Sequence, residues 1–305
     1  MVRVLVCDRI DEEGLKLLRG KGFQVDVKLG LTPEQLKETV KNYDALLVRG
    51  KTRVTREILE AAKGLKLVVR AGVGLDNVDL EAASRLGVKV ENTPEATTSS
   101  VAELTIGLML AVARRIPEAD RTVKGGGWGK EKFMGLSLKG KTLGIVGLGR
   151  IGCEVARVAR ALGMRVIYYD VVDRSAVARE LGCEPTASLE ELLRQAEIVS
   201  IHVPLTPETR HLIGKHELSI MKPNAILVNT SRGAVVDEEA LLEALKTGRL
   251  AGAGLDVFEE EPPKNLELLR LPNVVCTPHI GAQTVEAQKE ASIQAAKKVI
   301  EFFER

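Results

Sequence analysis

The sequence predicts an α/β protein built from two doubly wound parallel sheets. Short, β-branched apolar segments alternate with helical segments along all 305 residues. A long helical stretch and a segment rich in glycine and lysine separate two such series. Strands that alternate with helices form a parallel sheet covered on both faces, so each series predicts one sheet.

The first series supplies five expected strands and four expected helices. The strands are expected at Val2–Cys7, Phe23–Val27, Ala45–Val48, Leu67–Val69 and Val88–Val90, and the helices at Glu12–Leu18, Pro33–Asn42, Thr55–Ala62 and Leu80–Arg85. A longer helix is expected from Ser99 to Arg115, before the glycine- and lysine-rich segment Val123–Gly140.

The second series supplies six strands and four helices. The strands are expected at Thr142–Val146, Arg165–Tyr169, Ile198–Val203, Ala225–Asn229, Gly252–Val257 and Asn273–Thr277, and the helices at Ile151–Leu162, Leu189–Ala196, Glu238–Thr247 and Val285–Phe303. The last helix follows the last strand, so we expect it to return to the first lobe. The predicted domains are therefore 1–96 with 284–305, and 97–283. A cleft between them is expected, because small-ligand sites favour domain interfaces.

Composition excludes several classes of function. The net charge is +2, and apolar and charged residues make up 45% and 28%, which gives no footprint for nucleic acid or a membrane surface. The longest apolar run, Leu104 to Ala113, falls short of the roughly 20 residues of a membrane span. The four cysteines form no C-x-x-C pair and match no zinc pattern, so no metal is expected. With no leader before the first strand, we expect a cytoplasmic protein.

A glycine motif predicts the coenzyme site. Gly147-x-Gly149-x-x-Gly152 follows the strand Thr142–Val146 and opens the next helix, where a pyrophosphate binds at the positive end of the helix. Asp170 closes the following strand, about 20 residues on, where an acidic side chain binds ribose hydroxyls and repels a 2′-phosphate. The motif therefore predicts a Rossmann domain that binds NAD in preference to NADP.

Three strand ends of the second series carry groups suited to hydride chemistry. His279 follows the strand that ends at Thr277, while Arg232 and the glutamates before Pro262 follow two other strands. Ligands of open α/β sheets bind at the carboxyl ends of the strands, so we expect these groups to meet there. Oxidising an alcohol requires a base, which histidine supplies near neutral pH. A carboxylate would fix its tautomer, and an arginine would bind a substrate carboxylate with two parallel bonds.

The chain resembles the D-isomer-specific 2-hydroxyacid dehydrogenases along nearly its whole length. The segments that carry the resemblance are Arg70–Asp79, Asn92–Pro94, Val101–Leu104, Lys132–Gly135, Gly144–Gly152, Asn229–Gly233, Asp256–Phe258 and Pro278–Gly281. The resemblance implies a flavodoxin-like substrate domain beside the Rossmann domain. It assigns His279 as the acid–base, Glu261 as its partner and Arg232 as the carboxylate anchor. It also implies coenzyme contacts from Arg150, Ile151, Asp170, Val203, Pro204, Thr230, Asp256 and Gly281.

Within that family the chain is most similar to the members that oxidise 3-phosphoglycerate in the first step of serine synthesis. Arg49 and Arg70 fall where the family places basic groups on the substrate. Thr97 and Gly50 depart from the usual asparagine and serine beside that pocket. The resemblance also implies a homodimer or homotetramer.

Other implications concern the arm and the chain end. Dimers of the family form through the arm after the long helix, and this would carry Lys130 or Lys132 toward a neighbouring site. Because the sequence ends at Arg305, after the last helix, we expect no regulation by serine through an added C-terminal domain.

Two alternative functions stay open. Another member of the family, a glyoxylate/hydroxypyruvate reductase or a D-lactate dehydrogenase, would share the catalytic set and differ in the basic groups offered to a phosphate. A corepressor-like scaffold that senses the coenzyme would keep the fold without turnover; the complete set of reacting residues argues against it.

Overall fold

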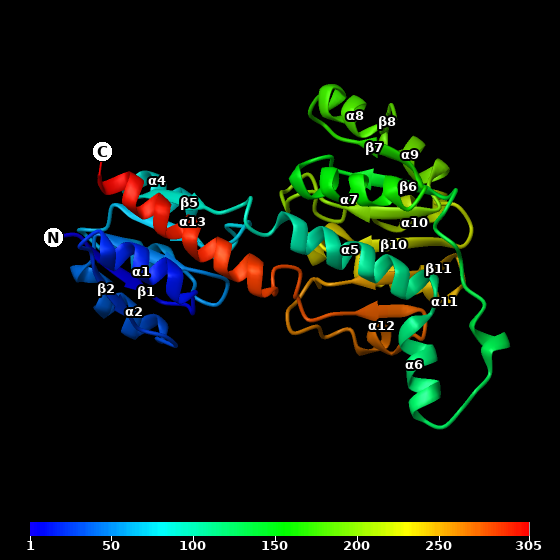
Figure 1. The fold of residues 1–305 in the computed structure, drawn as a ribbon, viewed down its shortest axis with the longest axis horizontal. Coiled ribbons are helices and arrows are strands. Elements are labelled where there is room, and N and C mark those ends of the chain that lie inside the picture. The colour runs from blue at the N-terminus through cyan, green and yellow to red at the C-terminus, as the bar shows by residue number, and fades with distance from the viewer. Residues whose placement is uncertain (305) are drawn as a thin grey trace. The chain divides into compact units, whose positions relative to one another are not determined.

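The computed structural model describes residues 1–304, which form two compact units (Figure 1). The first unit contains residues 1–98 and the described residues from 282 onward, and the second contains residues 99–281. The expected fold class is confirmed, because each unit is built on a parallel sheet with helices on both faces.

The sheet of the first unit has five parallel strands in the order β2-β1-β3-β4-β5, which is the flavodoxin-like order. The strands are β1 (Arg3–Val6), β2 (Gln24–Val27), β3 (Ala45–Val48), β4 (Leu67–Arg70) and β5 (Lys89–Asn92). Because side chains alternate along a strand, the sheet has two apolar faces. Val4 and Val6 lie in one core and Leu5 in the other.

Helices from both ends of the chain cover one face of this sheet. Figure 1 shows α13 (Val285–Phe303) beside α1 (Glu12–Gly20), and the Ser292 hydroxyl accepts the Asp11 N–H at 2.8 Å. A Cβ on Gly14 would lie 2.6 Å from the Ser292 carbonyl oxygen, so only glycine permits this close approach. The opposite face is covered by α2 (Pro33–Thr39), α3 (Arg56–Ala61) and α4 (Leu80–Arg85).

The sheet of the second unit has seven parallel strands in the order β12-β11-β10-β9-β6-β7-β8, a Rossmann order extended by one strand. The strands are β6 (Thr142–Val146), β7 (Arg165–Tyr169), β8 (Glu184–Pro185), β9 (Ile198–Ile201), β10 (Ala225–Asn229), β11 (Leu250–Leu255) and β12 (Val274–Cys276). The order reverses at β6, which lies between β7 and β9. Ligands of such sheets bind at this reversal, beyond the carboxyl ends of the strands.

Helices enclose a separate core on each face of the second sheet. One face packs against α5 (Thr98–Ala113), α7 (Arg150–Ala161) and α8 (Ser175–Leu181), and the other against α9 (Leu189–Gln195), α10 (Lys215–Ile220), α11 (Glu238–Lys246) and α12 (Leu266–Arg270). The remaining helix, α6 (Ile116–Lys124), and the segment that follows it extend away from the sheet (Figure 1). This segment includes the short 3-10 helix η2 (Lys130–Phe133).

Several expected boundaries were wrong. The helix expected over 99–115 ends at Ala113 because Arg115 has a left-handed backbone (φ 53°), after which α6 starts with a proline in its first turn. The helix expected over 33–42 ends at Thr39 and continues as a 3-10 turn, η1 (Val40–Asn42). Helices α6, α8, α10 and α12 and strand β8 were missed. All but α6 have two to seven residues, a length at which a periodic pattern is weak.

None of the helices between residues 1 and 304 combines the length and the apolar character needed to cross a membrane. Over the same residues, no group of three or more His, Cys, Asp or Glu side chains is placed to hold a metal ion.

Candidate active site

The three glycines after β6 shape the turn into α7. Gly147 has a φ of 93°, and a Cβ there would lie 2.7 Å from the His202 carbonyl oxygen. A Cβ on Gly152 would lie 2.3 Å from the Gly147 oxygen, so α7 can approach the turn only with glycine at this position. The second glycine, Gly149, has no atom within 4 Å of where a Cβ would lie. The turn is therefore closely packed at Gly147 and Gly152, and has free space beside Gly149.

This opening fits the pyrophosphate of a dinucleotide. Gly149 is the N-cap of the 12-residue helix α7 and has no side chain to bind the N–H groups of the first turn. Those groups and the positive end of the helix favour a phosphate. Arg150 is exposed at the start of the helix, and Ile151 is half-buried beside it.

Asp170 lies just after β7, the strand beside the glycine turn. Its carboxylate accepts the Leu148 N–H and the Val172 N–H, both at 2.9 Å. The guanidinium Nε of Arg174 also donates to it at 3.2 Å, a contact that the sequence did not suggest. The carboxylate thus fixes the loop near the glycine turn, and its bond to the ribose stays a prediction.

The other residues expected to contact the coenzyme lie at the carboxyl ends of neighbouring strands. Val203 and Pro204 follow β9. Thr230 follows β10, and its buried hydroxyl is 2.8 Å from the Thr105 hydroxyl of α5. The Gly281 carbonyl accepts the Ser100 hydroxyl at 2.6 Å. Two of these positions are therefore tied to α5.

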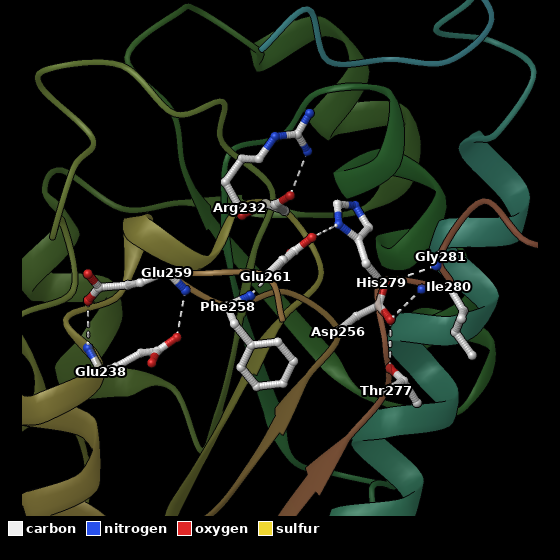
Figure 2. A network of polar contacts seen from close by, with 11 residues as sticks. Arg232, Glu238, Asp256, Phe258, Glu259, Glu261, Thr277, His279, Ile280 and Gly281 are labelled. Atoms are coloured by element: carbon white, nitrogen blue, oxygen red, sulfur yellow. Dashed lines mark hydrogen bonds and ion pairs between the residues drawn. The ribbon is translucent and has the colours of Figure 1, made fainter. Parts of the chain in front are cut away.

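His279 and Glu261 face each other at the same edge of the sheet (Figure 2). The imidazole Nδ1 is 2.8 Å from Glu261 Oε2, and the two side chains are 48% and 40% exposed. Burial alone would raise the pKa of Glu261, but the hydrogen bond and charge of His279, with smaller effects of Phe258 and Arg232, outweigh it and lower that pKa. The carboxylate is thus stabilised in its ionised form.

The main chain around His279 is held by Asp256, which follows β11 and is only 1% exposed. Its carboxylate accepts the Thr277 hydroxyl at 2.7 Å and the N–H groups of Ile280 and Gly281 at 2.8 Å each (Figure 2). His279 itself has a φ of 53°, which few residues with a side chain adopt. The expected coenzyme contact of Asp256 stays a prediction; both of its oxygens are used within this turn.

Arg232 follows β10, and both its main chain and its side chain form hydrogen bonds with residues of the same segment. The Asn229 amide donates to the Arg232 carbonyl at 2.9 Å, and the Arg232 guanidinium donates to the Ser231 carbonyl at 2.7 Å. A Cβ on Gly233 would lie 1.8 Å from the Phe258 carbonyl carbon. The segment that carries Arg232 is therefore in direct backbone contact with the loop that carries Glu261.

In the first unit, Arg49 and Arg70 lie at the carboxyl ends of the paired strands β3 and β4. The Arg70 Nε donates to the Arg49 carbonyl at 3.3 Å. Burial lowers the pKa of Arg49, and the charge of Asp8 partly opposes this. The buried Asp8 carboxylate accepts the Arg49 N–H at 2.6 Å and the Thr52 hydroxyl at 2.8 Å. Asp8 thus positions the loop that carries Arg49, a role that sequence reasoning did not predict.

Gly50 and Thr97 stand where the resemblance implies a serine and an asparagine, and both lie in the first unit. A Cβ on Gly50 would approach an Arg70 nitrogen only to 3.8 Å. Thr97 is buried, and its hydroxyl has no hydrogen-bond partner among residues 1–304. In the second unit, Lys130 and Lys132 are exposed on η2.

Two histidines that the sequence left as unremarkable have specific partners. The His202 ring is 2.9 Å from the Ser200 hydroxyl, and burial lowers the pKa of His202 to about 3, so it is neutral. The His211 Nε2 is 3.1 Å from a carboxylate oxygen of Glu259. Sequence reasoning also missed Glu238 and Glu259. The carboxylate of each accepts a hydrogen bond from the main-chain N–H of the other (Figure 2).

Comparison with known proteins identifies the family. Residues 106–281 match the model of the D-isomer specific 2-hydroxyacid dehydrogenase NAD binding domain. The chain is 50% identical over 299 residues to D-3-phosphoglycerate dehydrogenase of Methanocaldococcus jannaschii, covering 98% of this chain and 57% of that protein. It is 47% identical over 310 residues to glyoxylate reductase of Thermococcus litoralis, covering 98% and 93%.

A solved structure agrees with these matches. D-lactate dehydrogenase of Aquifex aeolicus, complexed with NAD and lactic acid, has a TM-score of 0.89 and 31% identity, over 99% of this chain and 95% of the other. The chain spans little more than half the length of the phosphoglycerate dehydrogenases that it matches. Its residues 106–281 are an NAD-binding domain, and the chain belongs to the D-isomer-specific 2-hydroxyacid dehydrogenase family.

Proposed function

We propose that the protein oxidises D-3-phosphoglycerate to 3-phosphohydroxypyruvate with NAD, the entry step of serine synthesis. The observation that carries the proposal is the pair of His279 and Glu261, 2.8 Å apart at the carboxyl edge of an NAD-binding sheet. Arg232, on a segment in backbone contact with the Glu261 loop, supplies the positive charge for an acid substrate.

The pair divides the two nitrogens of the imidazole between two tasks. With Nδ1–H donating to the ionised Glu261, Nε2 carries the lone pair and takes the proton of the substrate hydroxyl. NAD, when bound, accepts the hydride from the carbon that bears this hydroxyl. The protonated imidazole is then stabilised by the Glu261 carboxylate. In the reverse direction His279 returns the proton to the carbonyl oxygen.

The arginines are proposed to bind the anionic groups of the substrate. A guanidinium binds a carboxylate through two parallel N–H bonds, and this suits Arg232 to the substrate carboxylate. Arg49 and Arg70 lie side by side at the strand ends of the first unit and carry the charge that a phosphate requires.

A reductase of glyoxylate or hydroxypyruvate is the second candidate. Two observations favour it: the chain covers 93% of a glyoxylate reductase that is 47% identical, and Gly50 and Thr97 replace the serine and asparagine that the family resemblance implies at these positions. A D-lactate dehydrogenase would use the same catalytic set.

The test is a comparison of kcat/KM with NAD for 3-phosphoglycerate, D-glycerate and D-lactate, and with NADH for glyoxylate and hydroxypyruvate. We expect 3-phosphoglycerate to exceed the unphosphorylated acids. A preference for glyoxylate or hydroxypyruvate would establish the second candidate. No turnover of any of them would reject the proposed enzyme and favour a coenzyme-sensing scaffold.

We also propose that the chain forms a homodimer or homotetramer through the arm after α5. Large apolar side chains are exposed along this arm: Ile116 (51%), Val123 (53%), Trp128 (83%) and Met134 (87%). Such a surface is typical of a protein interface. Lys130 and Lys132 lie within it and would come with it toward a neighbouring subunit. Light scattering on the wild type and on Trp128→Ser with Met134→Ser would test this, with the monomer expected for the double variant.

A further inference from the structure

Two carboxylates outside the proposed reacting set join the loop that carries Glu261 to α11. Glu259 is two residues before Glu261, and Glu238 is the first residue of α11 (Figure 2). The Glu238 N–H donates to the Glu259 carboxylate at 3.1 Å, and the Glu259 N–H donates to the Glu238 carboxylate at 2.6 Å. Each residue thus binds the main chain of the other, which ties the loop to the helix at two points.

The physical setting stabilises the Glu259 carboxylate of this pair, whereas burial, together with the nearby charge of Glu259, raises the pKa of Glu238. The Glu259 carboxylate lies at the N-terminal, positive end of α11, where a negative charge is stabilised. The same carboxylate is 3.1 Å from His211 Nε2. Both glutamates are partly buried, so their hydrogen bonds are less exposed to competing water than surface bonds are.

Apart from the contact of Glu261 with His279, the other contacts described for this loop among residues 1–304 are long or lie within the loop. The bond from the Phe258 N–H to Glu261 is 3.4 Å long, at the outer limit for a hydrogen bond. The next residue, Glu260, is exposed and pairs with Lys264 within the same loop. The backbone contact of Gly233 with Phe258 limits approach from one side only. The Glu238–Glu259 pair therefore fixes the loop immediately before the proposed catalytic carboxylate.

We propose that Glu238 and Glu259 are positioning residues, which hold the Glu261 carboxylate against His279 by fixing its loop to α11. The proposal rests on the proposed function for its kinetic consequence, since Glu261 acts there by orienting His279. It assigns neither glutamate to contact with substrate or coenzyme. The expected effect lies on kcat and on the hydrogen bond between His279 Nδ1 and Glu261, with little effect on coenzyme binding.

Three single variants test the pair. Glu259→Ala removes the acceptor of the α11 N–H, Glu259→Gln keeps an acceptor oxygen, and Glu260→Ala is the matched control one residue along. For Glu259→Ala we expect kcat to fall about 10- to 100-fold, the cost of a small misplacement of reacting groups. We expect the KM for NAD to stay within about twofold in all three. Glu259→Gln should recover most of the lost kcat, and Glu260→Ala should match the wild type.

A second readout does not depend on turnover. The Nδ1–H proton of His279 is followed by NMR at one pH in the wild type and the variants, with a His279→Asn sample to assign the signal. A hydrogen bond to a carboxylate shifts such a proton downfield and slows its exchange with water. We therefore expect the signal to move upfield or to broaden in Glu259→Ala, and to stay at the wild-type position in Glu259→Gln and Glu260→Ala.

Glu238→Ala and the double variant Glu238→Ala with Glu259→Ala complete the test. Because the two residues act as one reciprocal pair, the double variant should lose much less than the product of the two single losses. A folded Glu259→Ala with wild-type kcat and an unmoved Nδ1–H signal would overturn the proposal, as would a lower melting temperature with no change in either. If the wild type oxidises no 2-hydroxy acid, the proposed function fails, and the NMR signal still decides whether the pair positions Glu261.

Discussion

The main-chain carbonyl of Asp256 accepts the N–H of His279 at 2.8 Å, while its side chain binds the next two N–H groups. One residue at the end of β11 thus determines the conformation of the turn that presents the imidazole. Because His279 has a φ of 53°, this turn is held by its surroundings against the preference of the residue itself.

Asp256→Asn tests this control. The amide retains one acceptor oxygen, but its NH₂ group would face the Gly281 N–H, so a buried donor loses its partner. We expect the free energy of unfolding to fall by about 1–3 kcal/mol, with a loss of turnover. Chemical denaturation and kcat measure the two effects. Thr277→Val, which removes one donor and leaves both main-chain bonds, should lose less; equal losses would contradict this account.

His279→Asn tests the general base. Asparagine tolerates the left-handed backbone better than most residues, so the turn should survive the change. We expect turnover to fall by about 10²–10⁴, the usual contribution of general acid–base catalysis. The affinity for NADH, measured by fluorescence, should be retained. Near-normal turnover would reject the assignment of His279.

Asp170→Ala tests coenzyme choice. The change removes a carboxylate that would repel a 2′-phosphate, and leaves Arg174 without this partner. The ratio of kcat/KM for NAD to that for NADP should fall. Asp173→Ala is the control, because Asp173 is exposed and accepts the N–H of Ser175, two residues further along the chain. An unchanged ratio in Asp170→Ala would show that another group sets the preference.

Gly233→Ala tests the backbone contact between the two catalytic segments. A methyl group would lie 1.8 Å from the Phe258 carbonyl carbon, so the segments must separate. We expect a loss of about 1–3 kcal/mol in the free energy of unfolding, and a fall in kcat. Gly107→Ala, in an exposed turn of α5 with no atom within 4 Å, should instead stabilise by about 0.5–1 kcal/mol. A neutral Gly233→Ala would refute the steric argument.

The ionisation of Glu261 predicts a pH dependence of stability. Its pKa is lowered from the ordinary value of 4.5, so the folded state favours the carboxylate. The resulting stability is present above the ordinary pKa and is lost as the pH falls through the lowered pKa. Urea midpoints of the wild type and Glu261→Gln, measured between about pH 3 and pH 7, should therefore converge at the acid end. A constant difference over this range would contradict the prediction.

Much of the fold was predictable because its signals are local. Central strands such as β3, β4 and β10 carry continuous apolar runs, and the glycine turn follows β6 directly. Helices shorter than two turns give a weak periodic signal, so α8, α10 and α12 were missed, although α3 and α4 are as short and were expected. The end of α5 and the start of α6 depend on the left-handed backbone of Arg115, which a hydrophobic pattern in the sequence does not reveal.

The candidate site was predictable as far as strand ends determine it. Parallel strands bring their carboxyl ends to one edge of the sheet, so the sequence alone could predict that Arg232, Glu261 and His279 lie near one another. The supporting residues could not be. Asp8 holds the Arg49 loop from 41 residues away, and Glu238 binds the main chain 21 residues along. When a carboxylate binds a main-chain group far along the chain, the sequence contains no pattern from which the partner could be predicted.

The return of α13 to the first sheet has a consequence for how the protein is made. Ala291, Ala295, Ala296 and Val299 of that helix complete a core that begins with Val4 and Val6. The second unit is one continuous stretch of chain, 99–281, and can fold as soon as the ribosome has released it. The first unit is split around it. Its apolar face by α1 stays uncovered until α13 is synthesised, so the first unit can complete its core only after the second unit has been released.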